Sequence, residues 1–218
     1  REAFFVARTG RPGPVLVDIP KDIQNESTEF VYSTDPINLP GYHLPKETNE
    51  SHLQEFADMV NAAEKPVILA GHGDLLSRAC KEVMDIAEKA SIPIATTLLG
   101  IGGVPESHPL VLGMMGMHGE SWVNHAIQDA DLLIACGMRF DDRVTGTLKT
   151  YSPNSKKIHI DIDASEINKN VLVDLAVHAD LGTVLRKVYP RIELSKKVDW
   201  LQTINSWHKD SQSRDIIN

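Results

Sequence analysis

The sequence predicts an α/β protein with a doubly wound parallel sheet of about six strands. First, residues 67–70, 132–136 and 158–162 form apolar strand-like runs, although the last contains His159 and Asp161, and we interpret them as strands with helices on both faces of their sheet. Second, segments with helical spacing of apolar residues alternate with these runs. Third, a loop rich in glycine or charge follows each run. These loops should meet at one edge of the sheet, where such folds bind ligands.

The composition is that of a globular protein and argues against several classes of partner. Of 218 residues, 42% are hydrophobic and 24% are charged, and the formal net charge is −8. No run is rich in lysine or arginine, which argues against binding to nucleic acid. No apolar run approaches the roughly 20 residues that span a bilayer, so we expect neither a signal peptide nor a membrane span. Cys80 and Cys136 lie far apart and are expected to be buried free thiols.

Residues 1–49 are expected to contain the end of one domain and the linker to the next. Residues 1–7 resemble the end of an amphipathic helix, 10–14 (GRPGP) form a rigid turn, and 15–19 look like a buried strand that Pro20 ends. We expect residues 1–24 to be the C-terminal end of a preceding domain, and the chain to be part of a larger polypeptide. Residues 25–49 are rich in Asn, Ser, Thr, Pro and Glu, which predicts an extended linker and a boundary near residue 45.

A second domain is expected over residues 50–190. It begins with a helix over about 51–63, a strand over 67–70, a helix over about 75–90 and a strand over 92–95. A long loop, 98–119, leads to a helix over 121–129, a strand over 132–136, a charged loop and a strand over 158–162. A short helix over 164–168, a strand over 175–178 and a helix over 182–189 complete the domain. Residues 191–218, with a helix over 200–209 that lacks a sheet to pack on, are expected to be a connector.

Glycine and hydroxyl groups follow the first two strands of this domain. Gly71 and Gly73 flank His72 at a strand-to-helix turn, where glycine lets backbone amides approach a phosphate. A plain connection explains this turn equally well, because the third glycine of a dinucleotide fingerprint is absent. Thr97, followed by Leu98 and Leu99, suits a ribityl or phosphate group, although threonine is ordinary at a strand end.

The long loop carries Met115, Gly116, Met117 and His118. Soft methionine side chains could line a flat aromatic ligand, or could simply belong to the core. No second ligand lies at a spacing that would make His118 part of a metal site, so we expect none.

Charged residues follow the next two strands. The loop after residue 136 contains Gly137, Met138, Arg139, Phe140, Asp141, Asp142 and Arg143. Arg139 could bind a phosphate through its forked guanidinium, or the run could be a solvated set of ion pairs. Asp161 and Asp163 lie on one face of a strand end, where carboxylates bind a ribose or cap the next helix, and Asp180 repeats the pattern. Together the loops predict a nucleotide-binding crevice along one edge of the sheet.

Four segments resemble the catalytic large subunits of the acetohydroxyacid synthase family, also called acetolactate synthases. They are GRPGPVLVDIPKDIQ (10–24), MMGMHG (114–119), GMRFDDRVTG (137–146) and KIHIDID (157–163). The resemblance covers nearly all of residues 1–190 and implies a three-domain enzyme that depends on thiamine diphosphate. It implies that residues 1–24 end the pyrimidine-binding domain, that 50–190 form a Rossmann-like central domain that binds FAD, and that 191–218 lead to the pyrophosphate-binding domain.

The resemblance also implies roles for individual residues. FAD contacts are implied at Arg11, Gly71, His72, Gly73, Thr97, Leu98, Leu99, Met115, Gly116, Met117, His118, Gly137, Met138, Arg139, Phe140, Asp141, Asp161, Ile162, Asp180 and Leu181. Lys21, Met115, Asp142 and Arg143 match positions near the active-site entrance where herbicides of this family bind. Members often have three glycines where this chain has Gly71, His72 and Gly73, so a close ligand approach to the middle Cα is in doubt.

The reaction implied for the parent enzyme is decarboxylation of pyruvate and transfer of the hydroxyethyl unit to pyruvate or 2-oxobutyrate, in branched-chain amino-acid biosynthesis. FAD is implied to be structural there. The family's catalytic glutamate segment and its motif for Mg2+ and diphosphate are absent from this sequence. We therefore expect no catalytic or metal-binding residue in it and no activity from it alone. The resemblance also implies a parent homodimer or tetramer, 2-oxo acid substrates, a regulatory small subunit, and a bacterial cytoplasmic or organellar location.

Two other interpretations stay open. A related thiamine-diphosphate carboligase of the glyoxylate carboligase type would share this domain, although RFDDRVTG (139–146) argues against it. A non-catalytic nucleotide-binding module, such as an electron-transfer flavoprotein domain, would share the fold, because a fold alone does not fix a function. The GRPGP turn and the linker after it favour a multidomain carboligase.

Overall fold

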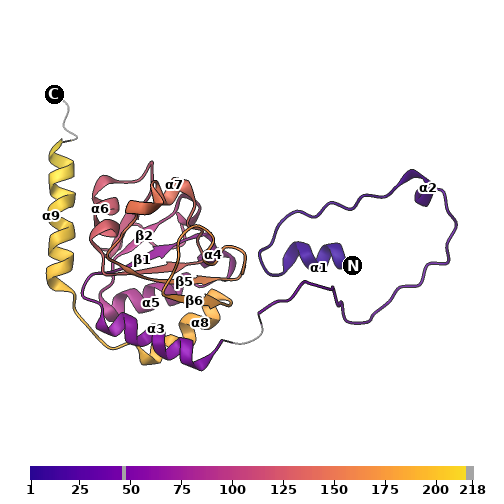
Figure 1. Ribbon diagram of the computed structural model, residues 1–218, viewed down its shortest axis with the longest axis horizontal. Coiled ribbons are helices and arrows are strands. Elements are labelled where there is room, and N and C mark those ends of the chain that lie inside the picture. The colour runs from indigo at the N-terminus through magenta and orange to yellow at the C-terminus, as the bar shows by residue number, and fades with distance from the viewer. Residues whose placement is uncertain (46–47, 215–218) are drawn as a thin grey trace. The chain divides into compact units, whose positions relative to one another are not determined.

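The computed structural model describes residues 1–45 and 48–214, and the chain divides into two compact units, 1–44 and 45–218. Figure 1 labels the helices and strands of both units.

The first unit contains two short helices, α1 (Glu2–Arg8) and α2 (Lys21–Gln24). The ring of Phe5 in α1 meets the ring of Tyr42 edge-on, with 5.9 Å between centroids. The strand predicted over 15–19 is wrong. These residues are exposed and form no strand, because none of the described residues supplies a neighbouring strand with which they could pair.

The second unit is built on one sheet of six parallel strands, which confirms the predicted fold class (Figure 1). The strands are β1 (Pro66–Ala70), β2 (Ile94–Thr96), β3 (Val111–Met114), β4 (Leu132–Cys136), β5 (Lys156–Asp161) and β6 (Leu175–His178). Their order is β3-β2-β1-β4-β5-β6, which is the order of dinucleotide-binding folds. The direction of winding reverses between β1 and β4, so the switch point lies there.

Strand β3 lies inside the segment that the sequence assigns to a long loop. It is an edge strand, it contains Gly113 with a φ of +115°, and its register with β2 shifts between Ile94 and Ala95. A short edge strand with a glycine lacks the continuous apolar run that marks a buried strand. Only its pairing with β2 defines it.

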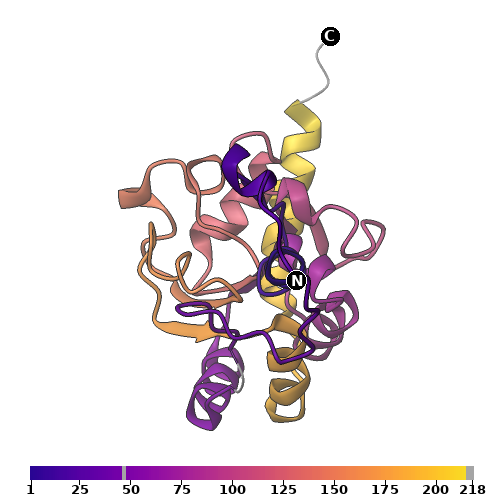
Figure 2. The same cartoon turned by 90° about the vertical axis from the view of Figure 1, so that its right-hand side faces the viewer.

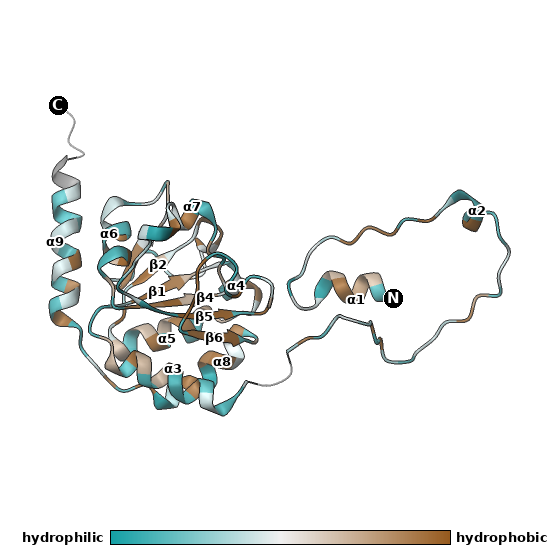
Figure 3. Cartoon of the chain, viewed as in Figure 1, coloured by the Kyte–Doolittle hydropathy of each residue, from teal (hydrophilic) through white to brown (hydrophobic). Residues whose placement is uncertain are grey.

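Helices cover both faces of the sheet (Figures 1 and 2). Helices α3 (Glu50–Ala62), α5 (Cys80–Ala90) and α8 (Leu181–Val188) pack on one face, where Phe56, Ile86 and Val184 are buried. Helices α6 (Ser121–Asp129) and α9 (Val198–Arg214) pack on the other, where Val123 and Ile204 are buried. Figure 3 shows the strands mostly in the brown of hydrophobic residues between helices of mixed colour. Because both faces of the sheet are covered, central strands such as β1 and β4 are apolar on both faces, whereas β5 alternates between isoleucine and buried polar residues.

The single helix predicted over 75–90 is two helices. Helix α4 (His72–Leu76) ends before a turn in which Arg78 has a φ of +55°, and α5 begins at Cys80. The amide of Ala79 donates to the carbonyl of Asp74 across this turn, at 2.8 Å. The break lets α4 follow the loops at the strand ends while α5 packs along the sheet face.

The short helix predicted over 164–168 is also wrong, because this segment forms turns. The carboxylate of Asp163 accepts hydrogen bonds from the amide of Ser165 (3.0 Å) and from its hydroxyl (2.6 Å). Asn168 has a φ of +57°. Side-chain bonds to the local backbone compete with helix formation, and here the turns form instead.

Helix α9 is part of the core, although the sequence suggested that it had no sheet to pack on. The indole nitrogen of Trp200 donates to the carbonyl of Pro66 at 3.1 Å, and Trp200 is buried. The rings of Trp122 in α6 and His208 in α9 are stacked with 4.1 Å between centroids. Residues 198–208 therefore cover the sheet face together with α6.

The remaining elements are short. They are α7 (Asp142–Thr145) and the 3-10 helices η1 (Leu98–Gly100), η2 (Leu148–Thr150) and η3 (Tyr189–Arg191). Both cysteines are free, but only Cys136 is buried, since Cys80 is partly exposed. In the part of the chain that the structure describes, no helix is both long and apolar enough to cross a membrane.

Candidate functional site

The predicted site residues of the second unit follow the carboxyl ends of the strands. We call this surface the carboxyl edge and define it as residues 71–73, 97–99, 115–118, 137–143, 161–163 and 180–181. Arg11 and Lys21 belong to the first unit, where both are exposed.

The loops after β1 and β4 are in close contact at the switch point. A Cβ added to Gly73 would lie 2.5 Å from the Cα of Gly137, and one added to Gly71 would lie 2.4 Å from the Gly137 carbonyl oxygen. Gly137 also has a φ of +54°. Glycine is therefore required on both sides of this contact, since a side chain on either loop would overlap the backbone of the other.

The amides of these glycines already have acceptors. Gly71 N–H donates to the Cys136 carbonyl at 3.0 Å, and Gly73 N–H donates to the Gly137 carbonyl at 2.9 Å. In this conformation both amides are used within the protein, which favours the plain connection over the phosphate-binding turn that the sequence left equally open. The glycines instead hold the ends of β1 and β4 together. Because these two strands lie far apart in the sequence, the Gly71-His72-Gly73 motif alone did not reveal this role.

The loop after β2 leaves two leucines exposed. The Thr97 amide donates to the Ala70 carbonyl at 2.9 Å, and its hydroxyl accepts from the Gly100 amide at 3.1 Å, so this threonine begins η1. The side chains of Leu98 and Leu99 remain 69% and 64% exposed. A ring nitrogen of His72 lies 2.9 Å from the Leu99 carbonyl and joins this loop to α4.

The methionine loop after β3 contacts the start of α7. A Cβ on Gly116 would lie 2.5 Å from the Arg143 carbonyl, and the Met117 amide donates to that carbonyl at 2.8 Å. The guanidinium of Arg143 lies 3.5 Å from the Met117 sulfur. Met115 is buried in the core, whereas Met117 and His118 are exposed. Met115 therefore belongs to the core, whereas the role of the exposed Met117 in lining a ligand stays a prediction.

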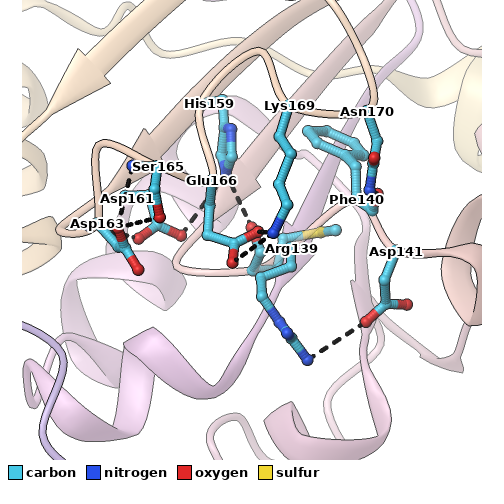
Figure 4. Close-up of polar contacts among 11 residues, drawn as sticks. Arg139, Phe140, Asp141, His159, Asp161, Asp163, Ser165, Glu166, Lys169 and Asn170 are labelled. Atoms are coloured by element: carbon cyan, nitrogen blue, oxygen red, sulfur yellow. Dashed lines mark hydrogen bonds and ion pairs between the residues drawn. The ribbon is translucent and has the colours of Figure 1, made fainter.

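The charged loop after β4 mixes core and surface residues. Met138 and Phe140 are buried, whereas Arg139 is exposed over 44% of its side chain and lies 3.5 Å from an oxygen of Asp141. The other Asp141 carboxylate oxygen is buried with no hydrogen-bond partner among the described residues. Figure 4 shows Arg139 and Asp141 facing each other beside the end of β5.

The aspartates at the far strand ends have different roles. One carboxylate oxygen of Asp161 accepts from the Asp163 amide at 2.8 Å. Asp180 accepts from the amide and the hydroxyl of Thr183, at 2.9 and 2.8 Å, and is the N-cap of α8. The Ile162 carbonyl lies 3.0 Å from a ring nitrogen of His178, and Leu181 is buried. Of the two explanations that the sequence left open, the cap holds for Asp180.

Two buried polar residues near this edge escaped the sequence analysis. Asp74 is 1% exposed, and neither of its carboxylate oxygens has a partner among the described residues. Burial raises its pKa well above the ordinary value. Burial, and then the charge of Asp74, also raise the pKa of the Cys136 thiol, which is therefore protonated and unreactive. His159 lies inside β5. The signal for His159 was a polar residue between two isoleucines in a strand, whereas Asp74, which follows Gly71, His72 and Gly73, carried no such signal.

A pocket of about 290 Å³ lies between α6 and α9, lined by His125, Gln128, Asp129 and Trp207, none of which is a predicted site residue. Within residues 1–45 and 48–214, no three His, Cys, Asp or Glu residues are grouped so that they could hold a metal ion.

Residues 53–188 match the family described as thiamine pyrophosphate enzyme, central domain. The chain belongs to this family. The matched segment runs from α3 to the end of α8 and includes all six strands.

Comparison with individual relatives is more specific than the family match. The chain is 44% identical to a probable acetolactate synthase large subunit of Methanocaldococcus jannaschii, over 94% of this chain and 35% of the relative. It is 45% identical to the acetolactate synthase large subunit of Corynebacterium glutamicum, over 89% of this chain and 31% of the relative. For isozyme 1 of Escherichia coli the identity is 41%, over 93% and 35%. These matches confirm the resemblance found in the sequence motifs. The chain spans about a third of the length of these relatives.

Proposed function

We propose that this chain supplies the FAD-binding central domain of an acetolactate synthase large subunit. The observation that carries the proposal is the strand order, whose switch point lies between the glycine loops after β1 and β4. The names of the relatives support the parent activity, which is decarboxylation of pyruvate and transfer of the hydroxyethyl unit to pyruvate or 2-oxobutyrate.

Several side chains on the carboxyl edge fit parts of FAD. The exposed guanidinium of Arg139 offers a forked donor to a pyrophosphate. The Asp161 carboxylate lies at the end of β5, where dinucleotide folds place the acid that binds a ribose. The exposed Leu98, Leu99 and Met117 offer apolar surface to the flavin ring. Bound FAD would supply a flat aromatic ring and a diphosphate, with no redox step required.

Some other predicted contact residues have fewer free polar groups to offer to FAD. The amides of Gly71 and Gly73 and the carboxylate of Asp180 are already hydrogen-bonded, so we propose that the ligand passes beside them. Arg11 is proposed as an FAD contact on the resemblance alone. Lys21, Met115, Asp142 and Arg143 would lie near the entrance to the parent active site.

Thiamine diphosphate and Mg2+ would bind to parts of the large subunit outside these 218 residues. The same holds for the catalytic groups that act on 2-oxo acids. The parent would be a homodimer or tetramer, with a regulatory small subunit, in the bacterial cytoplasm or in an organelle such as the chloroplast named for a tobacco relative.

The isolated chain should therefore form no acetolactate. The assay would contain pyruvate, thiamine diphosphate, Mg2+ and FAD, and the expected product level is that of the blank without protein. Acetolactate above the blank would contradict the assignment of the catalytic groups to other parts of the enzyme.

Flavin fluorescence tests the binding site itself. We expect FAD to bind the purified chain saturably, and Arg139→Ala to weaken the affinity about tenfold through the loss of a charge-assisted bond. Lys65→Ala is the matched control, because Lys65 is also ion-paired and 44% exposed but lies just before β1, at the opposite edge. Equal losses in both variants would overturn the placement of the site.

A further inference from the structure

His159 lies in the middle of a polar row on one face of β5. Side chains alternate along a strand, so Lys157, His159 and Asp161 point to one face while Ile158 and Ile160 point to the other. All three polar side chains are buried, and His159 has no exposed surface at all. The edge of its ring meets Phe140 with 5.2 Å between centroids and an angle of 75°. A polar ring in such a place must have a specific partner, because burial of an unpaired polar group is costly.

The partner is the loop that follows the neighbouring strand. His159 Nε2 lies 2.8 Å from the carbonyl oxygen of Met138. A carbonyl can only accept a hydrogen bond, so Nε2 carries the proton. The other ring nitrogen, Nδ1, is buried with no partner among the described residues. A second proton would be buried there without an acceptor, which favours the neutral ring with its single proton on Nε2.

The same nitrogen faces the acid at the end of β5. An oxygen of Asp161 lies 3.7 Å from Nε2, too far for a direct hydrogen bond, and the other oxygen accepts from the Asp163 amide. Figure 4 shows His159 between Asp161 on one side and the loop that carries Arg139 on the other. The imidazole thus holds the backbone just before Arg139 and borders Asp161 without neutralising its charge.

We propose that His159 is a positioning residue for a dinucleotide, and specifically for its adenosine ribose and diphosphate. Its one N–H fixes the Met138 carbonyl, and so the start of the loop that presents Arg139 to the diphosphate. Its neutral ring forms no ion pair with Asp161, so the carboxylate remains able to accept a ribose hydroxyl. The inference rests on the proposed FAD site and adds a residue that would not itself contact the ligand.

The test compares two flavins in three proteins. FAD contains the adenosine half and FMN lacks it, so affinity for FMN reports the rest of the site. We expect His159→Leu to weaken FAD binding about tenfold, the effect of one lost hydrogen bond in the binding step, and to change FMN binding by less than about twofold. His159→Gln keeps a neutral N–H donor and should restore FAD affinity to within about threefold of the original protein.

Each outcome decides a separate question. If the original protein binds neither flavin, the FAD assignment fails, and this inference fails with it. If it binds FAD and His159→Leu binds equally well, only the positioning role is wrong. Equal weakening of FAD and FMN would show a merely structural role, and lack of rescue by His159→Gln would contradict the N–H donor even where FMN binds too weakly to measure.

A spectroscopic readout covers the case in which His159→Leu does not fold. In the original protein, 15N chemical shifts of the histidine rings should show His159 with its proton on Nε2. A proton on Nδ1 would overturn the proposal without any variant. His159→Met, another apolar chain of similar size, then replaces the leucine variant in the titrations.

Discussion

At the residue scale, close contacts at the switch point decide which side chains are possible. Gly73 and Gly137 lie so near each other that a methyl group on either would overlap the other's backbone. The sequence marks Gly71 and Gly73 as a turn but gives no sign that Gly137 is their partner, because that contact depends on the pairing of β1 with β4. The glycines could be predicted, but their shared role could not.

Gly137→Ala should lower the free energy of unfolding by about 2 to 5 kcal/mol, from overlap with Gly73 and from a left-handed backbone. Gly102→Ala is the control, since Gly102 also has a positive φ but has no atom within 4 Å of an added Cβ. That variant should lose only the backbone term of about 1 to 2 kcal/mol. Urea denaturation followed by tryptophan fluorescence measures both, because Trp122, Trp200 and Trp207 all lie in the second unit. Equal losses would contradict the close contact.

Asp74→Asn should change how stability depends on pH. Burial raises the pKa of Asp74 in the folded chain, so the folded state keeps this proton at pH values where the unfolded state releases it. The stability of the original protein should therefore fall as the pH rises above the unfolded pKa of about 3.9. The asparagine variant lacks this term, so its stability relative to the original protein should increase as the pH rises above about 4. A difference that does not vary with pH would contradict the buried acid.

At the element scale, the apolar pattern identifies elements with a continuous apolar run or clear helical spacing, including the edge strand β6, but it misses the glycine-containing edge strand β3. Strand β4, strand β6 and helix α6 have the predicted bounds, because each has a continuous apolar run or clear helical spacing. Strand β3 was missed since an edge strand with a glycine carries neither signal. The packing of α9 was missed because its contacts are with α6 and with the start of β1, far away in the sequence.

Trp200→Ala should show that α9 belongs to the core. Removal of this buried ring and of its hydrogen bond to Pro66 should lower the free energy of unfolding by about 3 to 5 kcal/mol. Val198→Ala, on the same helix but exposed, should change it by less than about 0.5 kcal/mol. The remaining two tryptophans report unfolding by fluorescence. A small effect at Trp200 would mean that α9 packs only loosely on the sheet.

At the scale of the whole molecule, the topology assembles residues from separate loops at one edge of the sheet. The sequence predicts this edge, because parallel strands bring their following loops together. It does not show which polar groups are already used, and the structure assigns Thr97, Gly71, Gly73 and Asp180 to internal hydrogen bonds. Those hydrogen bonds belong to turns and helix caps. Their partners depend on the backbone geometry, which residue types alone do not give. Among the groups on this edge that remain available to a ligand are the side chains of Arg139 and Asp161 and those of the exposed Leu98 and Leu99.

The most direct test of this account is hydrogen–deuterium exchange of the purified chain with and without FAD. We expect FAD to slow exchange at residues 97–99, 137–143 and 161–163, on the carboxyl edge. Segments 64–66, 91–93 and 130–132, which precede strands at the opposite edge, should not change. Protection around His125 and Trp207, where the pocket between α6 and α9 lies, would contradict the site proposed here, as would the same exchange rates with and without FAD.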